Sequence, residues 1–391
     1  MPDRVDGGLR HGGTGHNVAV TSPPPTSEPP DPEPPDHGAP DHGAPGARVV
    51  WPGVSVVMPV LNEELHLERS VRRVLDQRYP GELEVILSIG PSKDRTAQIA
   101  AALVASDPRL RLVDNPAGRT PHALNLAVAA ARHDIIVRVD GHGELADEYI
   151  VRAVELLEAT GAANVGGVMD AQGQTAFEQA VACAYSTRLG LGGSTFHLES
   201  SPPGPADTVF LGSFRKSAIL QVGGFDESLW RAQDWELNYR LRQAGEVVWF
   251  SPDLKVTYRP RSSLPALVRQ MYETGKWRRE VVRRHPDTAG RRYLAPPVAV
   301  LGIASGTVLG MVGVLGRQPL LKLGFSAPVG YLALILGGSA VAPSWLSPAA
   351  RAWLPVVLVA THMSWGAGFL VGLRRRSDAP VADRSGGQPA R

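Results

Sequence analysis

From Val49 onward, hydrophobic and polar positions follow a pattern that predicts short buried strands alternating with helices. In residues 62–77, for example, Leu65, Val71 and Val74 recur at helical spacing and lie roughly on one face. Strands that alternate with helices indicate right-handed crossovers and a mostly parallel sheet, so the fold class is α/β. The expected strands are 54–60, 83–90, 111–115 and 135–140, and the helices between them are 62–77, 94–105 and 120–132.

The C-terminal part has a different pattern, with three long apolar segments that contain no Asp, Glu, Lys or Arg. About 20 such residues are enough to cross the hydrocarbon core of a membrane as a helix. We therefore predict a membrane region over 291–376. Because Pro296, Pro297 and several glycines fall in the first segment, we expect that segment to be irregular and the other two to be full spans. The segments are 295–316, 323–346 and 352–373.

The N-terminal residues 1–48 are rich in Pro, Gly, His and Asp, and the tail 377–391 is similarly polar. Such segments bury too little apolar surface to offset their chain entropy, so both are expected to be disordered. The formal net charge of the chain is only +2, which gives no case for a nucleic-acid partner. A single cysteine excludes an internal disulfide and a Cys-rich zinc site.

Polar residues follow all four predicted strands. In open α/β sheets, ligands bind beyond the carboxyl ends of the strands. Each polar stretch alone could merely cap a helix, but four at one edge of the sheet predict a single crevice. The fourth strand ends at Asp140, and His142 follows two residues later. The other three exits are PVLNEE (59–64), GPSKDRT (90–96) and NPAGRTPHALN (115–125).

These motifs, with FLGSFRKSAILQVGGFDE (210–227) and QDWELNYRLRQAG (233–245), give a recognisable set. Over roughly residues 52–285 the chain resembles family 2 glycosyltransferases with a GT-A fold. It looks most like the membrane-attached branch that contains succinoglycan-type exopolysaccharide glycosyltransferases. The resemblance implies a GT-A domain over 49–263 that transfers a sugar from a nucleotide-sugar donor with inversion at the anomeric carbon.

For the donor, the resemblance implies a divalent cation, Mn²⁺ or Mg²⁺, that neutralises the leaving diphosphate. The family's Asp-X-Asp motif is here Asp140-Gly141-His142. Asp140 is the expected metal ligand, whereas His142 could ligate the metal, bind a phosphate oxygen or only fill space. The expected donor-side residues are Pro59, Asn62, Glu63, Ser92, Asp94, Arg119, Asn125 and Asp140.

The pocket for the nucleotide base departs from the family pattern. Family members carry an Asp-Asp-Gly-Ser stretch after the second strand, and its second acid helps to bind uracil. Here the stretch is Ile89-Gly90-Pro91-Ser92, so the identity of the donor base is left open.

Direct displacement needs a general base that takes the proton of the acceptor hydroxyl. Asp234 occupies the family's position for this base; the competing interpretation is a helix N-cap, for which Asp is also favoured. Glu236 could likewise be an ordinary first-turn acid. The expected acceptor-side residues are Gly212, Ser213, Trp235 and Glu236.

Residues 264–290 are strongly basic and form a predicted amphipathic segment at the membrane surface. Their sequence loosely resembles the Gln-X-X-Arg-Trp element of processive synthases, although the spacing differs. A solvated basic helix is the alternative. The possible diphosphate contacts are Gln270, Lys276, Trp277 and Arg278.

The sequence thus predicts a glycosyltransferase of the plasma membrane, with several spans and a cytoplasmic catalytic domain. Its partners would be a nucleotide sugar, membrane lipids and a lipid-linked sugar or polysaccharide acceptor. Two rivals remain. One is a nucleotidyltransferase, against which the acidic PVLNEE loop argues; the other is a catalytically degenerate membrane scaffold, consistent with the altered Asp-Gly-His motif.

Overall fold

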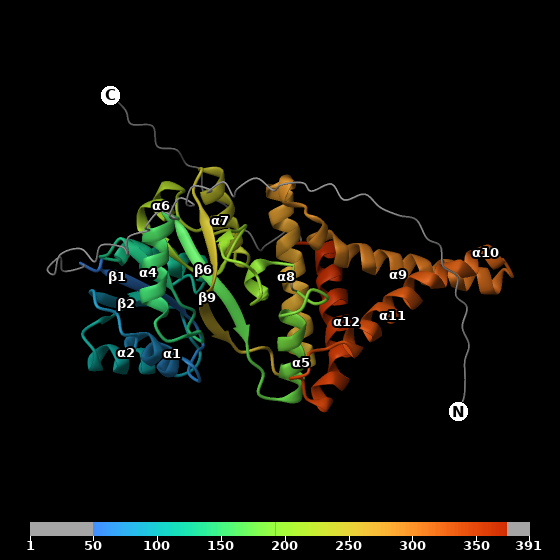
Figure 1. The fold of residues 1–391 in the computed structure, drawn as a ribbon, viewed down its shortest axis with the longest axis horizontal. Coiled ribbons are helices and arrows are strands. Elements are labelled where there is room, and N and C mark those ends of the chain that lie inside the picture. The colour runs from blue at the N-terminus through green and yellow to red at the C-terminus, as the bar shows by residue number, and fades with distance from the viewer. Residues whose placement is uncertain (1–49, 192, 374–391) are drawn as a thin grey trace, which may run out of the picture. The chain divides into compact units, whose positions relative to one another are not determined.

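The computed structural model describes residues 50–191 and 193–373, so the predictions for 1–48 and 377–391 lie outside the described residues. Residues 54–258 build one nine-stranded mixed sheet (Figure 1). The strands are β1 (Val54–Val60), β2 (Leu83–Ile89), β3 (Leu110–Asp114), β4 (Ile135–Arg138), β5 (Glu144–Leu145), β6 (Asn164–Ala171), β7 (Gly204–Pro205), β8 (Phe210–Arg215) and β9 (Val248–Tyr258).

The strand order is β3-β2-β1-β4-β8-β6-β9-β5, with β7 paired to β9. The first four strands are mutually parallel, as the alternation of strands and helices predicts. β8 runs antiparallel to both of its neighbours, β4 and β6, and β9 is parallel to β6. The expected α/β fold with a mostly parallel sheet is therefore confirmed.

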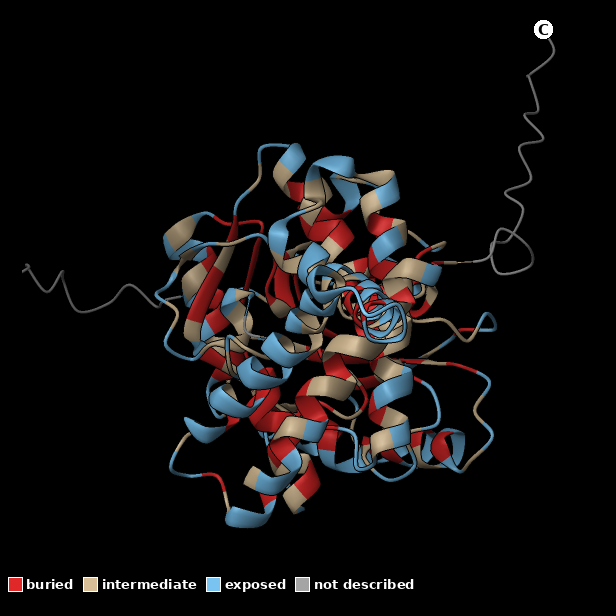
Figure 2. Cartoon of the chain, turned by 90° about the vertical axis from the view of Figure 1, so that its right-hand side faces the viewer, coloured by how far each residue is buried: buried red, intermediate tan, exposed pale blue. Residues whose placement is uncertain are grey.

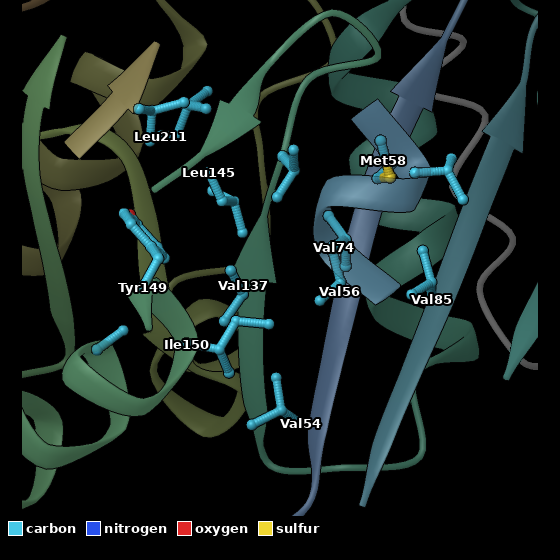
Figure 3. Packing of buried hydrophobic residues seen from close by; sticks show 14 of the residues in the cluster. Val54, Val56, Met58, Val74, Val85, Val137, Leu145, Tyr149, Ile150 and Leu211 are labelled. Atoms are coloured by element: carbon cyan, nitrogen blue, oxygen red, sulfur yellow. The ribbon is translucent and has the colours of Figure 1, made fainter. Parts of the chain in front are cut away.

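Both faces of the sheet are covered by helices, which explains why its central strands are almost continuously apolar. On β1, Val56 and Met58 face one side and Val57 faces the other, and all three are buried. Figure 3 shows the first of these layers, with Val85 of β2 and Val74 of a covering helix. The helices are α1 (Leu67–Leu75), α2 (Thr96–Ser106), α3 (Thr120–Ala130), α4 (Tyr149–Thr160), α5 (Ala176–Tyr185), α6 (Lys216–Gln221) and α7 (Gln233–Gln243).

The first helix is shorter than the sequence pattern predicts. α1 begins at Leu67, and Leu65 is 81% exposed, so its expected place on the buried face is wrong. Leu67, Val71 and Val74 form that face instead. The preceding residues belong to the loop that leaves β1, whose backbone bonds to the loop that follows β2.

Beyond the sheet, the chain is helical. Three helical segments are long and apolar enough to cross a membrane: Arg291–Leu315, Pro319–Ala340 and Pro348–Val371. Most residues of the first two are exposed, and the helices that face the viewer in Figure 2 are mainly pale blue and tan. The elements are α8 (Leu264–Arg284), α9 (Arg291–Leu315), α10 (Pro319–Lys322), α11 (Ser326–Ala340) and α12 (Pro348–Val371), with short 3₁₀ turns at Thr195–His197, Pro286–Thr288 and Leu323–Phe325.

The irregularity expected in residues 295–316 does not occur, because α9 is continuous over its 25 residues. Its glycines form a contact face. A Cβ on Gly306 would lie 2.5 Å from the carbonyl oxygen of Gly324, and one on Gly310 would lie 2.6 Å from the Phe325 ring. These glycines let the chain after α9 fold back closely against it, which is how small residues act in apolar helix pairs.

α8 and α12 pack side by side, with α5 against α12 (Figure 1). Their contact depends on two glycines. A Cβ on Gly275 of α8 would lie 2.0 Å from the carbonyl oxygen of Trp365, and one on Gly368 of α12 would lie 2.0 Å from that of Tyr272. The predicted surface helix 264–290 is thus largely a packed one, with Met271 and Val281 buried.

Replacing Gly368 by leucine should separate these two helices. Overpacking of this kind costs about 1–3 kcal/mol, so the thermal unfolding temperature of the purified protein in detergent should fall. Gly337→Leu on α11 is the matched control, because a Cβ there meets nothing within 4 Å. Equal unfolding temperatures for the two variants would contradict the close α8–α12 contact.

Candidate active site

A cavity of about 620 Å³ opens beyond the carboxyl ends of β1 and β4. Only some of the polar residues that follow the predicted strands line this cavity. Pro59 and Glu63 line it from the first exit, Arg119 from the third and Asp140 from the fourth, together with His142. Asp234 of α7 also lines it, although it follows Asp140 by more than ninety residues.

A buried arginine joins the two most important acids of this cavity. Arg138 is the last residue of β4, and its side chain is only 5% exposed. Its Nε and Nη2 donate to Oδ1 of Asp140 over 3.2 and 2.9 Å. Its Nη1 donates to Oδ1 of Asp234. One guanidinium therefore fixes both carboxylates relative to each other.

Asp234 lies in the first turn of α7, but it is not the helix N-cap. The N-cap is Ala232, which adopts a left-handed backbone (φ 62°), and no side chain caps the helix end. The capping interpretation of Asp234 is therefore wrong. Burial, the largest influence, raises the pKa of its carboxyl above the ordinary value, while Arg138 opposes the change. A carboxylate that binds protons more readily is better suited to act as a general base.

The Asp140-Gly141-His142 turn meets the loop that follows β1. Nδ1 of His142 and Oε1 of Glu63 are 2.8 Å apart, and this contact is the main reason why the pKa of His142 is raised. The turn can approach this loop so closely because residue 141 is glycine; a Cβ there would lie 2.9 Å from Cγ of Glu63. In the described residues, no group of three or more His, Cys, Asp or Glu side chains could hold a metal alone.

Three arginines bring positive charge to the same cavity. Arg119, Arg231 and Arg261 all line it. The guanidinium of Arg119 stacks on the ring of Trp230, with its carbon 3.6 Å from the ring centroid. Three guanidinium groups beside a cavity are well suited to a diphosphate, which arginine can bind through paired N–H groups.

Four predicted donor residues lie in the framework of the site and do not line the cavity. Asn62 accepts from the backbone N–H of Lys93 (2.8 Å), and Ser92 accepts from that of Asn62 (3.0 Å). Asp94 binds the backbone N–H groups of Glu64 and Thr96, and Asn125 holds Phe225 through two backbone hydrogen bonds. These residues connect the loops by hydrogen bonds and so position the residues beside them.

At the place of the missing base-pocket acid, the side chain of Leu61 and the backbone of Gly118 pack closely against Gly90. A Cβ on Gly90 would lie 3.0 Å from Leu61 and 3.3 Å from Gly118. Nearby, Asn115 lines the cavity; it is 3% exposed, and its Oδ1 has no hydrogen-bond partner in the described residues. This amide oxygen is a candidate acceptor for an N–H group of the donor base.

A second cavity of about 570 Å³ adjoins the first, and both are lined by Ala232, Asp234 and Thr274. Its walls come from the 188–197 loop, β8, α7 and α8 on one side and from α9, α11 and α12 on the other. Asp234 therefore stands where two cavities meet, one polar and one bounded by the apolar helices.

The four predicted acceptor residues differ in their relation to this second cavity. Trp235 lines it. Gly212 and Ser213 are buried within β8, immediately after the lining residue Leu211. Glu236 points elsewhere, since it is buried and pairs with Arg240 at 2.7 Å.

The four residues of α8 that were predicted as possible diphosphate contacts lie in different places in the structure. Trp277 lines the first cavity and Arg278 the second. Gln270 donates to the hydroxyl of Tyr258 (3.0 Å), and Lys276 pairs with Glu273 (3.0 Å). Neither of these last two lines either cavity.

Sequence reasoning missed Arg138, Asn115, Trp230, Arg231 and Arg261. Arg138 carried a signal, because a charged residue inside a buried apolar strand needs a partner. Asn115 also stands at a strand exit. The other three lie in loops without regular spacing, and nothing in the sequence pattern brings them to the cavity.

Comparisons with known proteins identify the family of the chain. Residues 55–218 match the model of the family described as Glycosyl transferase family 2. Succinoglycan biosynthesis protein ExoA of Rhizobium meliloti (strain 1021) is 34% identical over 330 residues, which cover 82% of this chain and 96% of that protein. A dolichyl N-acetyl-alpha-D-glucosaminyl phosphate 3-beta-D-2,3-diacetamido-2,3-dideoxy-beta-D-glucuronosyltransferase of Methanococcus voltae is 22% identical, over 59% of this chain and 74% of its own.

Among solved structures, mannosyltransferase PcManGT from Pyrobaculum calidifontis, in complex with GDP-Man and Mn²⁺, superimposes with a TM-score of 0.50. It is 20% identical, and the match covers 80% of this chain and 88% of that one, so the likeness shows the fold alone. The identity to ExoA extends over nearly all of that protein. The chain is therefore a member of glycosyltransferase family 2, and it is a glycosyltransferase with a GT-A fold.

Proposed function

We propose that this enzyme transfers a sugar with inversion, from a nucleotide sugar to a lipid-linked sugar or polysaccharide acceptor at the cytosolic membrane face. The observation that carries the proposal is the position of Asp234 at the junction of the two cavities. A base in this place contacts donor and acceptor at once, which is the geometry that a direct displacement needs.

In this proposal the first cavity holds the donor. Arg119, Arg231 and Arg261 bind the diphosphate, whose negative charge grows as it leaves. Asn115 contacts the base in place of the acid that the Gly90 position lacks. Four residues position the loops and do not contact the donor directly: Asn62, Ser92, Asp94 and Asn125.

The donor set fits a divalent cation that is shared with the diphosphate. Mg²⁺ and similar ions are often held by one or two carboxylates plus substrate phosphates, so a cluster of three protein ligands is not required. Asp140 presents a partly exposed carboxylate whose Oδ1 is already held by Arg138. His142 keeps Nε2 for a ligand or a phosphate, since Nδ1 faces Glu63. When bound, the cation would stabilise the leaving diphosphate as a Lewis acid.

The chemical step then follows from the positions of the residues. The acceptor hydroxyl in the second cavity attacks the anomeric carbon from the face opposite the diphosphate. Asp234 accepts the hydroxyl proton as the new glycosidic bond forms and the bond to the diphosphate breaks. Arg138 keeps the Asp234 carboxylate aimed at the junction.

The acceptor assignment rests on the second cavity and on the relatives. Helices long and apolar enough to cross a membrane form one of its walls. The relative from Rhizobium meliloti is named for succinoglycan biosynthesis, and the one from Methanococcus voltae for a dolichyl phosphate-linked substrate. We place the enzyme in the plasma membrane with several spans and with the sheet on the cytosolic side, where nucleotide sugars are expected.

Asp234→Asn should abolish transfer and leave donor binding nearly intact. The amide keeps the shape of the side chain but cannot take the proton, and a general base contributes about 10²–10⁴-fold to rate. The measurement is binding and turnover of UDP-, GDP- and dTDP-sugars, with Mn²⁺ and with EDTA. Asp253→Asn, an exposed acid on β9, is the matched control.

Loss of donor binding in Asp234→Asn would reassign this residue to the donor site. Absence of any donor binding or hydrolysis by the folded wild-type protein would favour a degenerate scaffold.

The pH dependence of kcat/KM should reveal the raised pKa of Asp234. A base works only when ionised, so activity should be complete above this pKa and fall as the pH drops through it. The acid limb is expected above 3.8, the ordinary value for Asp, because burial raises the pKa. Circular dichroism at each pH controls for unfolding. A limb at or below 3.8 would show that Asp234 is not the titrating base.

Asp140→Asn should weaken donor binding only when the metal is present. The stimulation by Mn²⁺ should fall about tenfold or more, since even an outer partner of a metal ligand is worth about 10–100-fold. Asp114→Asn, an exposed acid at the end of β3, serves as control. Unchanged Mn²⁺ stimulation would remove Asp140 from the metal site.

A further inference from the structure

The second cavity contains a buried arginine that forms no direct ion pair within the described residues. Arg278 of α8 is 5% exposed, and among the described residues no carboxylate lies within 4 Å of its guanidinium. The acid that acts on it from farther away, Asp207, is already paired with Arg292. Its Nη2 donates to the carbonyl of Thr288 (3.0 Å), while its Nε has no partner. A buried cation is costly unless an anion or a set of acceptors compensates it.

Aromatic rings hold this guanidinium in place. Its carbon is 3.3 Å from the ring centroid of Tyr293 and 4.2 Å from that of Trp235. Such stacking stabilises a cation and fixes the plane of its N–H groups. Burial lowers the pKa of Arg278 to about 10, so the side chain is still protonated at neutral pH.

The neighbouring arginine is already engaged, in contrast to Arg278. Arg292 pairs with Asp207 at 3.2 Å and donates to the carbonyl of Gly193 over 2.8 Å. Two further polar groups that line the cavity lack partners within the described part of the chain: Oγ1 of Thr361 on α12 and Nδ1 of His197. Burial and Arg292 lower the pKa of His197 to about 3, so this imidazole is neutral.

One part of the cavity wall is apolar and belongs to the candidate membrane helices. Ala299 of α9, Leu334 of α11 and Trp365 of α12 form this part, and Asp234 lines the same cavity. A ligand that satisfies all of these features has an anionic head beside Arg278, an apolar chain along the helices and a sugar that reaches Asp234.

We propose that this cavity binds an acceptor glycan attached to a lipid through a phosphate or diphosphate, and that Arg278 is the receptor for that phosphate. Arginine suits this role because its planar donors match phosphate oxygens in pairs. The inference rests on the proposed function and adds that the phosphate itself is recognised, which makes it a determinant of acceptor specificity.

The test uses the purified full-length protein in detergent. Binding of a long-chain polyprenyl phosphate is compared with binding of the matching polyprenol, which lacks the phosphate. The wild type should prefer the phosphate by about tenfold or more, the factor expected for charge-assisted hydrogen bonds. This comparison needs no variant, so it holds even if a substitution at Arg278 impairs folding.

Arg278→Gln should lose most of this preference, and Arg278→Lys should keep part of it. Arg283→Gln is the matched control, because Arg283 lies on the same helix with its side chain 65% exposed. Donor binding should be unchanged in all three variants. Failure of donor binding in the wild type would count against the proposed function, whereas the headgroup comparison is read independently of the donor.

Three results would overturn the inference. The first is equal binding of polyprenol and polyprenyl phosphate, and the second is an undiminished phosphate preference in Arg278→Gln. The third is displacement of the polyprenyl phosphate by phosphatidylglycerol, by inorganic pyrophosphate or by a soluble glycan at the same concentration. Displacement by phosphatidylglycerol would indicate a bulk-lipid site, displacement by pyrophosphate a free-anion site, and displacement by the soluble glycan a polysaccharide site.

Discussion

The pairing of one buried guanidinium with two carboxylates is the interaction on which the rest of the site depends. Arg138 stands at the end of the central strand β4, where an unpaired charge would cost several kcal/mol. Asp140, on the loop that leaves the strand, and Asp234, on α7, compensate it together. Because both acids contact the same guanidinium, the position of Asp140 is coupled to that of Asp234.

This arrangement also accounts for the fixed meeting point of the two cavities. α7 begins at a strained residue, Ala232, whose left-handed backbone directs Asp234 toward Arg138. Left-handed geometry is unfavourable for a residue with a Cβ, and such strain is typical of functional sites. The ion pair to Arg138 gives a stabilising interaction at the point where the backbone is strained.

The fold could be predicted largely from the sequence, and the reason is physical. Apolar runs that are buried on both faces and helices with one apolar face are local patterns, so the strands 54–60 and 83–90 are found nearly to the residue. Errors occur where tertiary contacts replace local pattern. Leu65 has a helical spacing but lies in a loop, and the glycines of α9 serve packing instead of interrupting the helix.

The candidate site could be predicted only in part. Its acids, Asp140 and Asp234, could be predicted because they stand in motifs that resemble those of the family. Arg231 and Arg261 come to the cavity through loops, so their positions depend on the whole fold. Asn62 and Asn125 match the family's motifs, yet the structure uses them to hold loops. A motif therefore identifies residues that build a site. It does not distinguish the residues that would contact ligands from those that hold the loops in place.

The junction between the sheet and the apolar helices is where structure adds most to sequence. α8 and α12 approach closely through Gly275 and Gly368, and Asp234 lines the second cavity together with residues of α9, α11 and α12. Arg278 lies on α8 three residues after Gly275, and its guanidinium is stacked against Trp235 of α7 and Tyr293 of α9. A buried arginine retained in a cavity that apolar helices help to form is most simply explained by an anionic ligand. Docking of α12 would then do more than anchor the enzyme, because it would also form the site that recognises the acceptor.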